Sequence, residues 1–138
     1  MKKILITGSR NYGLCEAICN LFDATPDIEY ETASRSNGYH LDTSEGQKKL
    51  AEKYIEGDFD IFINNSAIWK FQQVMVVEAV YNAMEEADRK GHIINLGSTA
   101  DTGVKGRTWR YPTEKKALKA YNRDLTYKAM GGSNIKTT

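Results

Sequence analysis

The sequence contains no long hydrophobic run and no excess of one charge. Its uninterrupted apolar stretches are a few residues long, whereas a membrane-spanning helix needs about 20. Met1–Thr7 is basic and then apolar, but its apolar part is too short for a signal peptide and leads into polar residues, so we expect no such leader. The 19 Lys and Arg residues nearly balance the 18 Asp and Glu residues. The resulting net charge of +1 argues against a protein that coats a polyanion.

Cysteine and histidine are scarce. Cys15 and Cys19 are the two cysteines, and they lie four residues apart in a segment with helical spacing, where a disulfide between them is geometrically poor. A zinc site would need further ligands, and His40 and His92 are far away in sequence without the usual ligand spacing. We therefore predict no disulfide framework and no metal site, and we expect two buried thiols in a protein of the reducing cytoplasm.

Strand-like and helix-like segments alternate along the 138 residues, a length typical of one domain with one core. Short β-branched or apolar runs predict strands at 3–7, 28–33, 59–64 and 91–97, with a very short one at 39–41 and the start of another at 135–138. Helical spacing marks segments around 14–22, 50–55, 74–84 and 117–129, and a capping box at 42–45 opens the second of these. In the first helix, the residues at helical spacing are Leu14, Ala17, Ile18, Leu21 and Phe22.

This alternation, with apolar strands that are buried on both faces, predicts an α/β fold: a Rossmann-like three-layer sandwich with a mostly parallel, doubly wound sheet. We expect one such domain over residues 1–138. Ligands of these sheets bind beyond the carboxyl ends of the strands, where the strand order reverses. The chemistry is therefore expected just after Thr7, Ala33, Asn64 and Gly97.

A glycine-containing turn follows the first predicted strand. It runs from Gly8 to Gly13 and opens a helix. Such a turn offers free backbone N–H groups to a phosphate, with help from the helix dipole. Glycines also end strands for turn geometry alone, so this turn by itself leaves both interpretations open.

Polar residues also cluster after two later strands. Asn64 and Asn65 end one strand, and Ser98 follows the next. Thirteen residues after Ser98 comes Tyr111, with Lys115 four residues further along, at the start of the last predicted helix. A tyrosine and a lysine at this spacing lie on one helix face, because residues i and i+4 are neighbours.

Taken together, these residues resemble the short-chain dehydrogenase/reductase family. That family has a Thr-Gly-x-x-x-Gly-x-Gly turn, an Asn-Asn-Ala-Gly strand end, a serine after the fifth strand, and Tyr-x-x-x-Lys downstream. The chain carries these elements in the same order, as Thr7-Gly8 with Gly13, Asn64-Asn65-Ser66-Ala67, Ser98, and Tyr111 with Lys115. The resemblance spans residues 3–135 and implies an NAD(P)-dependent oxidoreductase that interconverts a carbonyl and an alcohol.

The resemblance assigns catalytic roles to Ser98, Tyr111 and Lys115. Tyr111 would donate a proton to the substrate oxygen in reduction and accept one in oxidation. A free phenol, with a pKa of about 10, is a weak base near neutrality, and the Lys115 charge would stabilise its phenolate. Ser98 would hold the substrate oxygen, and the cofactor would supply the hydride. A half-buried tyrosine beside Pro112 and a serine that caps a turn are the structural alternatives.

The resemblance also implies a set of cofactor contacts from the glycine turn, the following strand ends and the catalytic pair. They are Gly8, Ser9, Arg10, Tyr12, Gly13, Leu14, Arg35, Asp42, Asn65, Ser66, Tyr111 and Lys115. We predict NADP(H) as the preferred cofactor, with NAD(H) as the alternative. The second strand ends in Thr-Ala-Ser-Arg, without the carboxylate that NAD binders place there, and Arg10 and Arg35 would hold the 2′-phosphate. Glu31 is the main argument against this preference, since a two-residue error in the strand boundary would bring it to the strand end.

The chain departs from the family pattern in four places. The glycine turn has one extra residue, and Cys15 stands at the family's last glycine. Ser66-Ala67 replaces Ala-Gly. The asparagine of the family's catalytic tetrad has no counterpart, and Gln72 and Gln73 are candidates of equal rank. The sequence stops where the family's sixth strand begins, so we interpret it as a compact or C-terminally truncated member that lacks the late strands and the substrate loop.

Two other function classes stay open. A non-catalytic dinucleotide-binding or regulatory module would keep the fold and the cofactor turn without turnover. A scaffold or nucleic-acid-binding protein would use the basic run between Lys105 and Lys119, although the interspersed acids favour an ordinary solvated surface.

For the enzyme, we expect a small carbonyl or alcohol substrate, no nucleic acid, no membrane, and a homo-oligomer that forms through segments 71–90 and 112–130. Val74, Val77, Tyr81, Tyr121 and Leu125 are candidate interface residues, with core packing as the simpler use.

Overall fold

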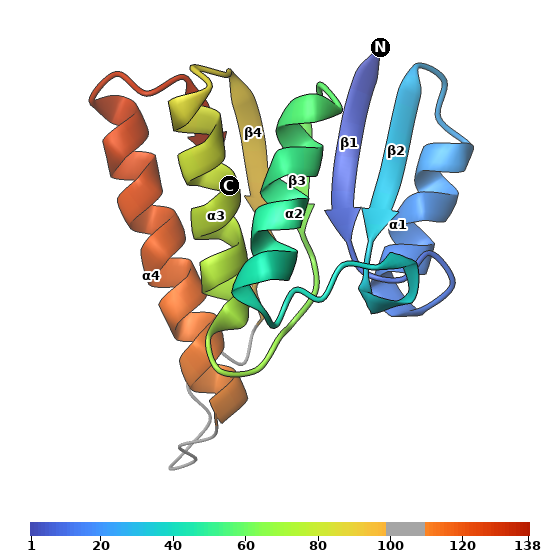
Figure 1. The fold of residues 1–138 in the computed structure, drawn as a ribbon, viewed down its shortest axis with the longest axis horizontal. Coiled ribbons are helices and arrows are strands. Elements are labelled where there is room, and N and C mark those ends of the chain that lie inside the picture. Colours follow the sequence, from blue (N-terminus) through green and yellow to red (C-terminus); the bar gives the residue numbers. More distant parts are fainter. Residues whose placement is uncertain (99–109) are drawn as a thin grey trace.

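The computed structural model describes residues 1–98 and 110–138, in which five parallel strands form one sheet in the order β2-β1-β3-β4-β5 (Figure 1). The strands are β1 (Lys2–Thr7), β2 (Ile28–Ala33), β3 (Ile61–Asn64), β4 (Gly91–Asn95) and β5 (Ile135–Thr137). The helices are α1 (Gly13–Asp23), α2 (Ser44–Glu56), α3 (Gln72–Glu86) and α4 (Arg110–Met130), with a short 3-10 turn, η1 (Arg35–Asn37). This arrangement confirms the predicted Rossmann-like, doubly wound α/β fold.

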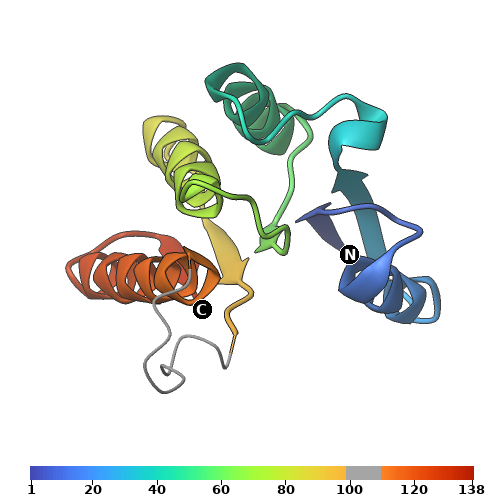
Figure 2. The ribbon, with the colours of Figure 1, turned by 90° about the horizontal axis from the view of Figure 1, so that it is seen from below.

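Helices cover the two faces of the sheet unequally. α1 lies on one side, while α2, α3 and α4 lie on the other (Figure 2). Alternation along β1 sends Leu5 into the larger core with α2, α3 and α4, and sends Ile4 and Ile6 into a smaller core under α1. Because the order reverses between β1 and β3, the loops after these two strands meet at one end of the sheet.

The apolar stripe expected for α1 is wrong for three of its five members, because Leu14, Ala17 and Leu21 are exposed. Leu14 and Leu21 are 59% and 68% exposed, and the residues that pack on the sheet are Cys15 and Cys19, with Ile18 and Phe22 beside them. The reason is space. A Cβ at Gly8 would lie only 3.0 Å from the Cβ of Cys15, so the glycine turn passes directly over the start of α1 and leaves room for a small side chain. The expectation of two buried thiols is confirmed.

The very short strand predicted at 39–41 does not form. Its backbone groups bond locally instead: the N–H of Tyr39 donates to the carbonyl of Ser34, and the carbonyl of His40 accepts from the N–H of Thr43. This segment crosses the beginning of α2 so closely that a Cβ at Gly46 would overlap the carbonyl of His40. The cap of α2 lies one residue later than the capping box at 42–45 places it: Thr43 is the N-cap, and its hydroxyl accepts from the N–H of Gly46.

Core packing also takes most of the residues considered for a dimer interface. Val77, Tyr81 and Leu125 are buried in the larger core, and Val74 and Tyr121 pack partly buried against it. These five residues therefore stabilise the sheet–helix layer, as the simpler alternative expects.

The Tyr54→Phe substitution is expected to raise the free energy of unfolding by about 1 kcal/mol. Tyr54 is fully buried, and its hydroxyl has no hydrogen-bond partner among the described residues. Burial accordingly raises the pKa of Tyr54. Urea unfolding of the wild type and the variant measures the effect. Tyr81→Phe is the matched control and should destabilise, because the Tyr81 hydroxyl bonds that of Ser133. A destabilised Tyr54→Phe variant would contradict this account of the core.

Candidate functional site

A cleft of about 440 Å³ opens at the carboxyl ends of β1, β3 and β4. It is lined by the glycine turn, the start of α1, the strand ends and the first turns of α4. These residues are Gly8, Ser9, Tyr12, Gly13, Leu14, Cys15, Ser34, Asn65, Ser66, Ala67, Leu96, Gly97, Tyr111 and Lys115. A second hollow, of about 550 Å³, lies between α2 and α3, away from the strand ends, and is lined largely by alanines and surface charges. The cleft is therefore the candidate site.

Side chains join the loops after β1 and β3 at the floor of the cleft. The Thr7 hydroxyl accepts hydrogen bonds from the N–H groups of Asn65 (2.9 Å) and Ser66 (3.1 Å). The Asn65 amide in turn donates to the carbonyl of Thr7. Gly8 has a φ of 131°, and a Cβ there would lie 2.8 Å from Asn65 Nδ2. Glycine is thus required at this position both by its backbone conformation and by the close approach of the Asn65 side chain.

The start of α1 faces the same cleft. Its first three residues, Gly13, Leu14 and Cys15, line the cleft, and the N-cap residue Tyr12 makes no side-chain capping bond. The first N–H groups of a helix have no partner within the helix and attract anions. A Cβ at Gly13 or at Gly97 would meet no atom within 4 Å, so the cleft is open above both. These features fit the phosphates of a dinucleotide and would let them approach the backbone.

Lys115 lies at the other end of the cleft and is only 4% exposed. Its ammonium donates to Gln73 Oε1 at 2.8 Å and to the carbonyl of Leu96 at 2.9 Å. Nζ is 5.7 Å from the centre of the Tyr111 ring, so the i, i+4 pair does share one face of α4. Burial lowers the pKa of Lys115 from its ordinary value. A buried amine beside a half-buried phenol is an arrangement that can move a proton.

An amide network fixes the side chain that holds Lys115. Gln73 Nε2 donates to the carbonyl of Asn64 at 3.0 Å, which turns Oε1 towards Lys115. Asn64 Nδ2 returns a bond to the carbonyl of Gln73 and another to Asn95 Oδ1, and Asn95 bonds Asn122. Of the two glutamines considered from sequence, Gln73 therefore reaches the site, whereas Gln72 bonds Gln47 on α2.

The cleft brings together nine of the twelve cofactor residues that were predicted. Arg10, Arg35 and Asp42 are outside its lining. Ser98 directly follows the lining residue Gly97 and is half-buried. Lys105 and Arg107 of the basic run lie outside the described residues. Within 1–98 and 110–138, no three His, Cys, Asp or Glu side chains are grouped to hold a metal ion.

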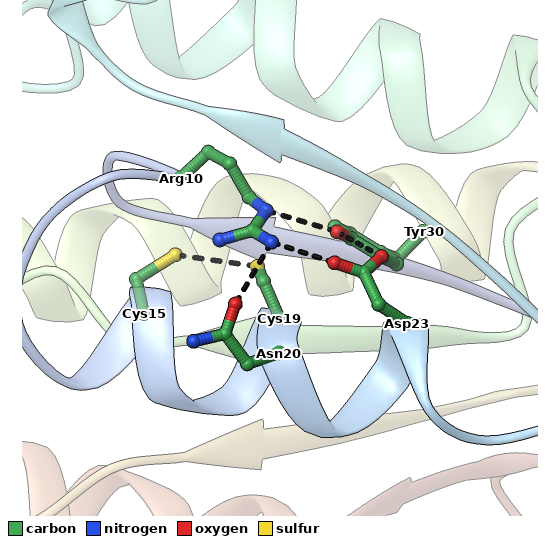
Figure 3. A network of polar contacts seen from close by, with 6 residues as sticks. All are labelled: Arg10, Cys15, Cys19, Asn20, Asp23 and Tyr30. Atoms are coloured by element: carbon green, nitrogen blue, oxygen red, sulfur yellow. Dashed lines mark hydrogen bonds and ion pairs between the residues drawn. The ribbon is translucent and has the colours of Figure 1, made fainter.

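Arg10 turns away from the cleft and bonds the far end of α1 (Figure 3). Its Nη2 donates to Asp23 at 2.6 Å and to Asn20 at 2.9 Å, and its Nε donates to the Tyr30 hydroxyl at 3.0 Å. Hydrogen bonds from the Tyr30 hydroxyl and then from the Arg10 guanidinium hold the pKa of Asp23 below its ordinary value. In this arrangement Arg10 anchors the glycine turn to α1 and β2.

The end of β2 lies where the sequence predicts it. Glu31 is two residues before the strand end, and its carboxylate pairs with Lys53 of α2 at 3.0 Å. Ser34 is the residue at this strand end that lines the cleft. Arg35 follows it and lies 3.6 Å from Asp42, and both side chains are largely exposed. The strand end therefore offers a hydroxyl and a nearby guanidinium, with the acid of Glu31 directed elsewhere.

The cleft also contains residues that sequence reasoning did not assign: Cys15, Ser34, Ala67, Leu96 and Gly97. Gly97 and Ser34 lie beside predicted strand ends, so the rule for ligand sites in such sheets could have found them. Leu96 contributes through its carbonyl, and no side-chain pattern signals that. Within the described residues, no helix is both long and apolar enough for a membrane span.

Solved structures with the same fold include short-chain dehydrogenase/reductases and named dehydrogenases. One, from Burkholderia phymatum and in complex with NAD, matches 99% of this chain with a TM-score of 0.78 at 17% identity. Serine dehydrogenase from Escherichia coli matches 98% with a TM-score of 0.68 at 17% identity. A proposed NAD(P)-dependent gluconate 5-dehydrogenase from Beutenbergia cavernae, with bound NADP, matches 97% with a TM-score of 0.72 at 18% identity. The chain spans 63%, 79% and 68% of these proteins' lengths, respectively. No family model and no curated protein matches the sequence.

Proposed function

We propose that this chain, which has the fold of the short-chain dehydrogenase/reductases, is a member of that family and an NAD(P)-dependent oxidoreductase that interconverts a carbonyl and an alcohol. The observation that carries the proposal is the Tyr111–Lys115 pair, which lies in the same cleft as the glycine turn and the open start of α1. A free N-terminal helix turn suits a pyrophosphate, and a phenol beside an ammonium suits proton transfer to a carbonyl oxygen.

In the proposed site, the residues divide between holding the cofactor and moving the proton, and Lys115 serves both tasks. The N–H groups of α1 and the backbone of Gly8 and Gly13 hold the phosphates, and Asn65 and Ser66 form the floor beneath the cofactor. Lys115 binds the nicotinamide ribose and stabilises the phenolate of Tyr111. Tyr111 gives its hydroxyl proton to the substrate oxygen in reduction and takes one in oxidation, while Ser98 orients that oxygen. The bound nicotinamide supplies or takes the hydride.

Cofactor binding and turnover test the proposal separately. At a concentration of one hundred times Kd, either cofactor should stabilise the protein by roughly 2.7 kcal/mol in thermal unfolding. Oxidation of NADPH or NADH in the presence of a panel of aldehydes and ketones then reports turnover. Binding without turnover would support the non-catalytic module of the same fold. Absence of binding by both cofactors would remove both functions.

Within this function, we propose NADP(H) as the preferred cofactor. Support comes from Arg35 beside the β2 end and from the engagement of Glu31 by Lys53. Arg10 does not support this preference, since its guanidinium donates to Asp23 and Asn20. Arg35→Asp should weaken NADPH binding and shift preference towards NADH, because a carboxylate repels the 2′-phosphate and accepts from a ribose hydroxyl. Calorimetric titration of both cofactors measures the shift. Tighter binding of NADH than of NADPH by the wild type would contradict the proposed NADP(H) preference.

We also propose that the chain is a homo-oligomer in the cytoplasm. With the earlier interface candidates buried or partly buried, the exposed apolar residues on α3 and α4 are Met75, Tyr127 and Met130. Light scattering at tens of micromolar should give at least twice the mass of 15.6 kDa. Met75→Lys should reduce that mass if α3 contributes to the interface. A monomer at that concentration would refute the assembly.

A further inference from the structure

The loop between β3 and α3 contains two consecutive non-glycine residues in the left-handed region. Lys70 has a φ of 60° and Phe71 a φ of 59°. Such conformations are unfavourable for residues with a side chain, and they persist where the surrounding structure holds them. Phe71 is also the N-cap of α3, and its side chain makes no capping bond.

A buried carboxylate from α4 meets this turn. Glu114 is 9% exposed, and its Oε1 accepts a hydrogen bond of 2.8 Å from the N–H of Phe71. A buried carboxylate is costly unless it is hydrogen-bonded, and the bond from the Phe71 N–H offsets part of that cost. It also puts a negative charge beside the N-terminus of α3, where the helix dipole favours it. A second contact joins the same segments, because the Arg110 guanidinium lies 5.8 Å from the Trp69 ring.

The turn decides where α3 begins, and α3 begins with the side chain that holds Lys115. Gln73 lies two residues after Phe71 and accepts from the Lys115 ammonium. The residues between the turn and α4 are closely packed and leave a cavity of only about 10 Å³. Its lining includes Phe71, Gln73, Tyr111, Glu114 and Lys115. A shift of the turn would therefore move Gln73 relative to Lys115, since Gln73 follows the turn by two residues and packs closely against Lys115.

We propose that Glu114 is a positioning residue, whose carboxylate fixes the Lys70–Phe71 turn and thereby sets Gln73 against the Lys115 ammonium. Glu114 and Lys115 are consecutive on α4. The same helix therefore fixes the turn through Glu114 and binds, through Lys115, the Gln73 side chain that the turn positions. The proposal rests on the proposed function only for the role of Lys115 in cofactor binding and proton transfer.

The test compares three variants in the full chain without cofactor. Glu114→Leu removes the acceptor, Glu114→Asp shortens its reach, and Glu114→Gln keeps an acceptor oxygen of the same reach. Asp124→Leu, at an exposed position on the same helix, is the charge control. Hydrogen exchange of the Phe71 amide should accelerate at least tenfold in the Leu and Asp variants. It should stay near the wild-type rate in the Gln variant and in the control.

The second readout is the titration of Lys115, followed by NMR of its side chain. The pKa of Lys115 should fall by at least half a unit in the Leu and Asp variants, because a displaced Gln73 no longer accepts from the ammonium. The other titratable side chains that share the cleft walls with Lys115 are Tyr12, Cys15, Tyr111 and Glu114, and only Glu114 changes in this series. The Gln variant should titrate like the wild type.

Each outcome decides the proposal. Unchanged Phe71 exchange in both the Leu and the Asp variant would overturn the anchoring role. Faster exchange with an unchanged Lys115 titration would overturn the positioning role and leave Glu114 as a helix cap only. Should Glu114→Leu fail to fold, Glu114→Asp carries the same comparison. Failure of the wild type to bind NADPH or NADH would overturn the proposed function while leaving both NMR readouts valid.

Discussion

Tyr111→Phe should lower kcat by about 10²–10⁴-fold, the usual contribution of a positioned proton donor. The substitution removes only the hydroxyl that would transfer the proton. The phenyl ring still fills its half-buried place on α4, and Lys115 keeps its bonds to Gln73 and to the carbonyl of Leu96. The fold and the affinity for the cofactor should therefore be unchanged, so the loss should appear in kcat and in kcat/KM together.

Steady-state kinetics with the best carbonyl substrate, together with a fluorescence titration of NADPH, separates these quantities. Tyr127→Phe is a matched control, because Tyr127 lies on the same helix as Tyr111, is 64% exposed and is outside the lining of the cleft. Its activity should stay within a few-fold of the wild type. Comparable turnover by Tyr111→Phe would remove Tyr111 from the catalytic role.

Lys115→Met should weaken cofactor binding and slow turnover together, because one ammonium serves both tasks in the proposed site. A hydrogen bond from a charged group contributes about 1.5–3 kcal/mol, which corresponds to a loss of affinity of roughly 10- to 150-fold. Loss of the positive charge beside Tyr111 adds a separate loss in kcat. Lys116→Met changes the neighbouring, exposed lysine in the same way and should leave both quantities near wild type.

The pH dependence of cofactor binding gives the same lysine a second signature. Burial lowers the pKa of Lys115 below its ordinary value of 10.5, so the ammonium is lost as pH rises through that lowered pKa. Wild-type affinity should therefore fall on the alkaline side, before free lysine titrates. The Cys15 thiol stays neutral in this range, because burial raises its pKa to about 12. Lys115→Met should lack this alkaline fall. A variant with the same decline would exclude Lys115 as its source.

Periodicity predicted the fold well where it had long segments to work with. The strand at 28–33 lies where the pattern places it, and the helix that Thr43 caps begins one residue later than its pattern predicts, since local turn chemistry and tertiary packing agree there. The stripe on α1 was wrong because packing under the glycine turn favours Cys15 over the larger Leu14. The strand at 39–41 failed because a close crossing over Gly46 satisfies its backbone locally.

Sequence order predicted most of the cleft, because in a parallel sheet the residues after successive strands meet at one edge. It could not show where long side chains point. Arg10 and Asp42 both belong to predicted cofactor segments, yet their charges are paired outside the lining of the cleft, with Asp23 and Arg35 respectively. Gln73 contacts Lys115, which is 42 residues away in sequence, and Glu114 contacts Phe71, which is 43 residues away. No motif marks pairs at such separations.

Hydrogen exchange of the protein with and without saturating NADPH tests the central claim most directly, because it maps where the dinucleotide binds. Amides of Gly13, Leu14 and Cys15 at the start of α1, and those of Asn65 and Ser66, should exchange at least tenfold more slowly with NADPH, while the groove between α2 and α3 should be unchanged. Unchanged exchange of the cleft amides at saturating NADPH, or slower exchange confined to the groove between α2 and α3, would contradict the assignment of the cleft as a nicotinamide dinucleotide site.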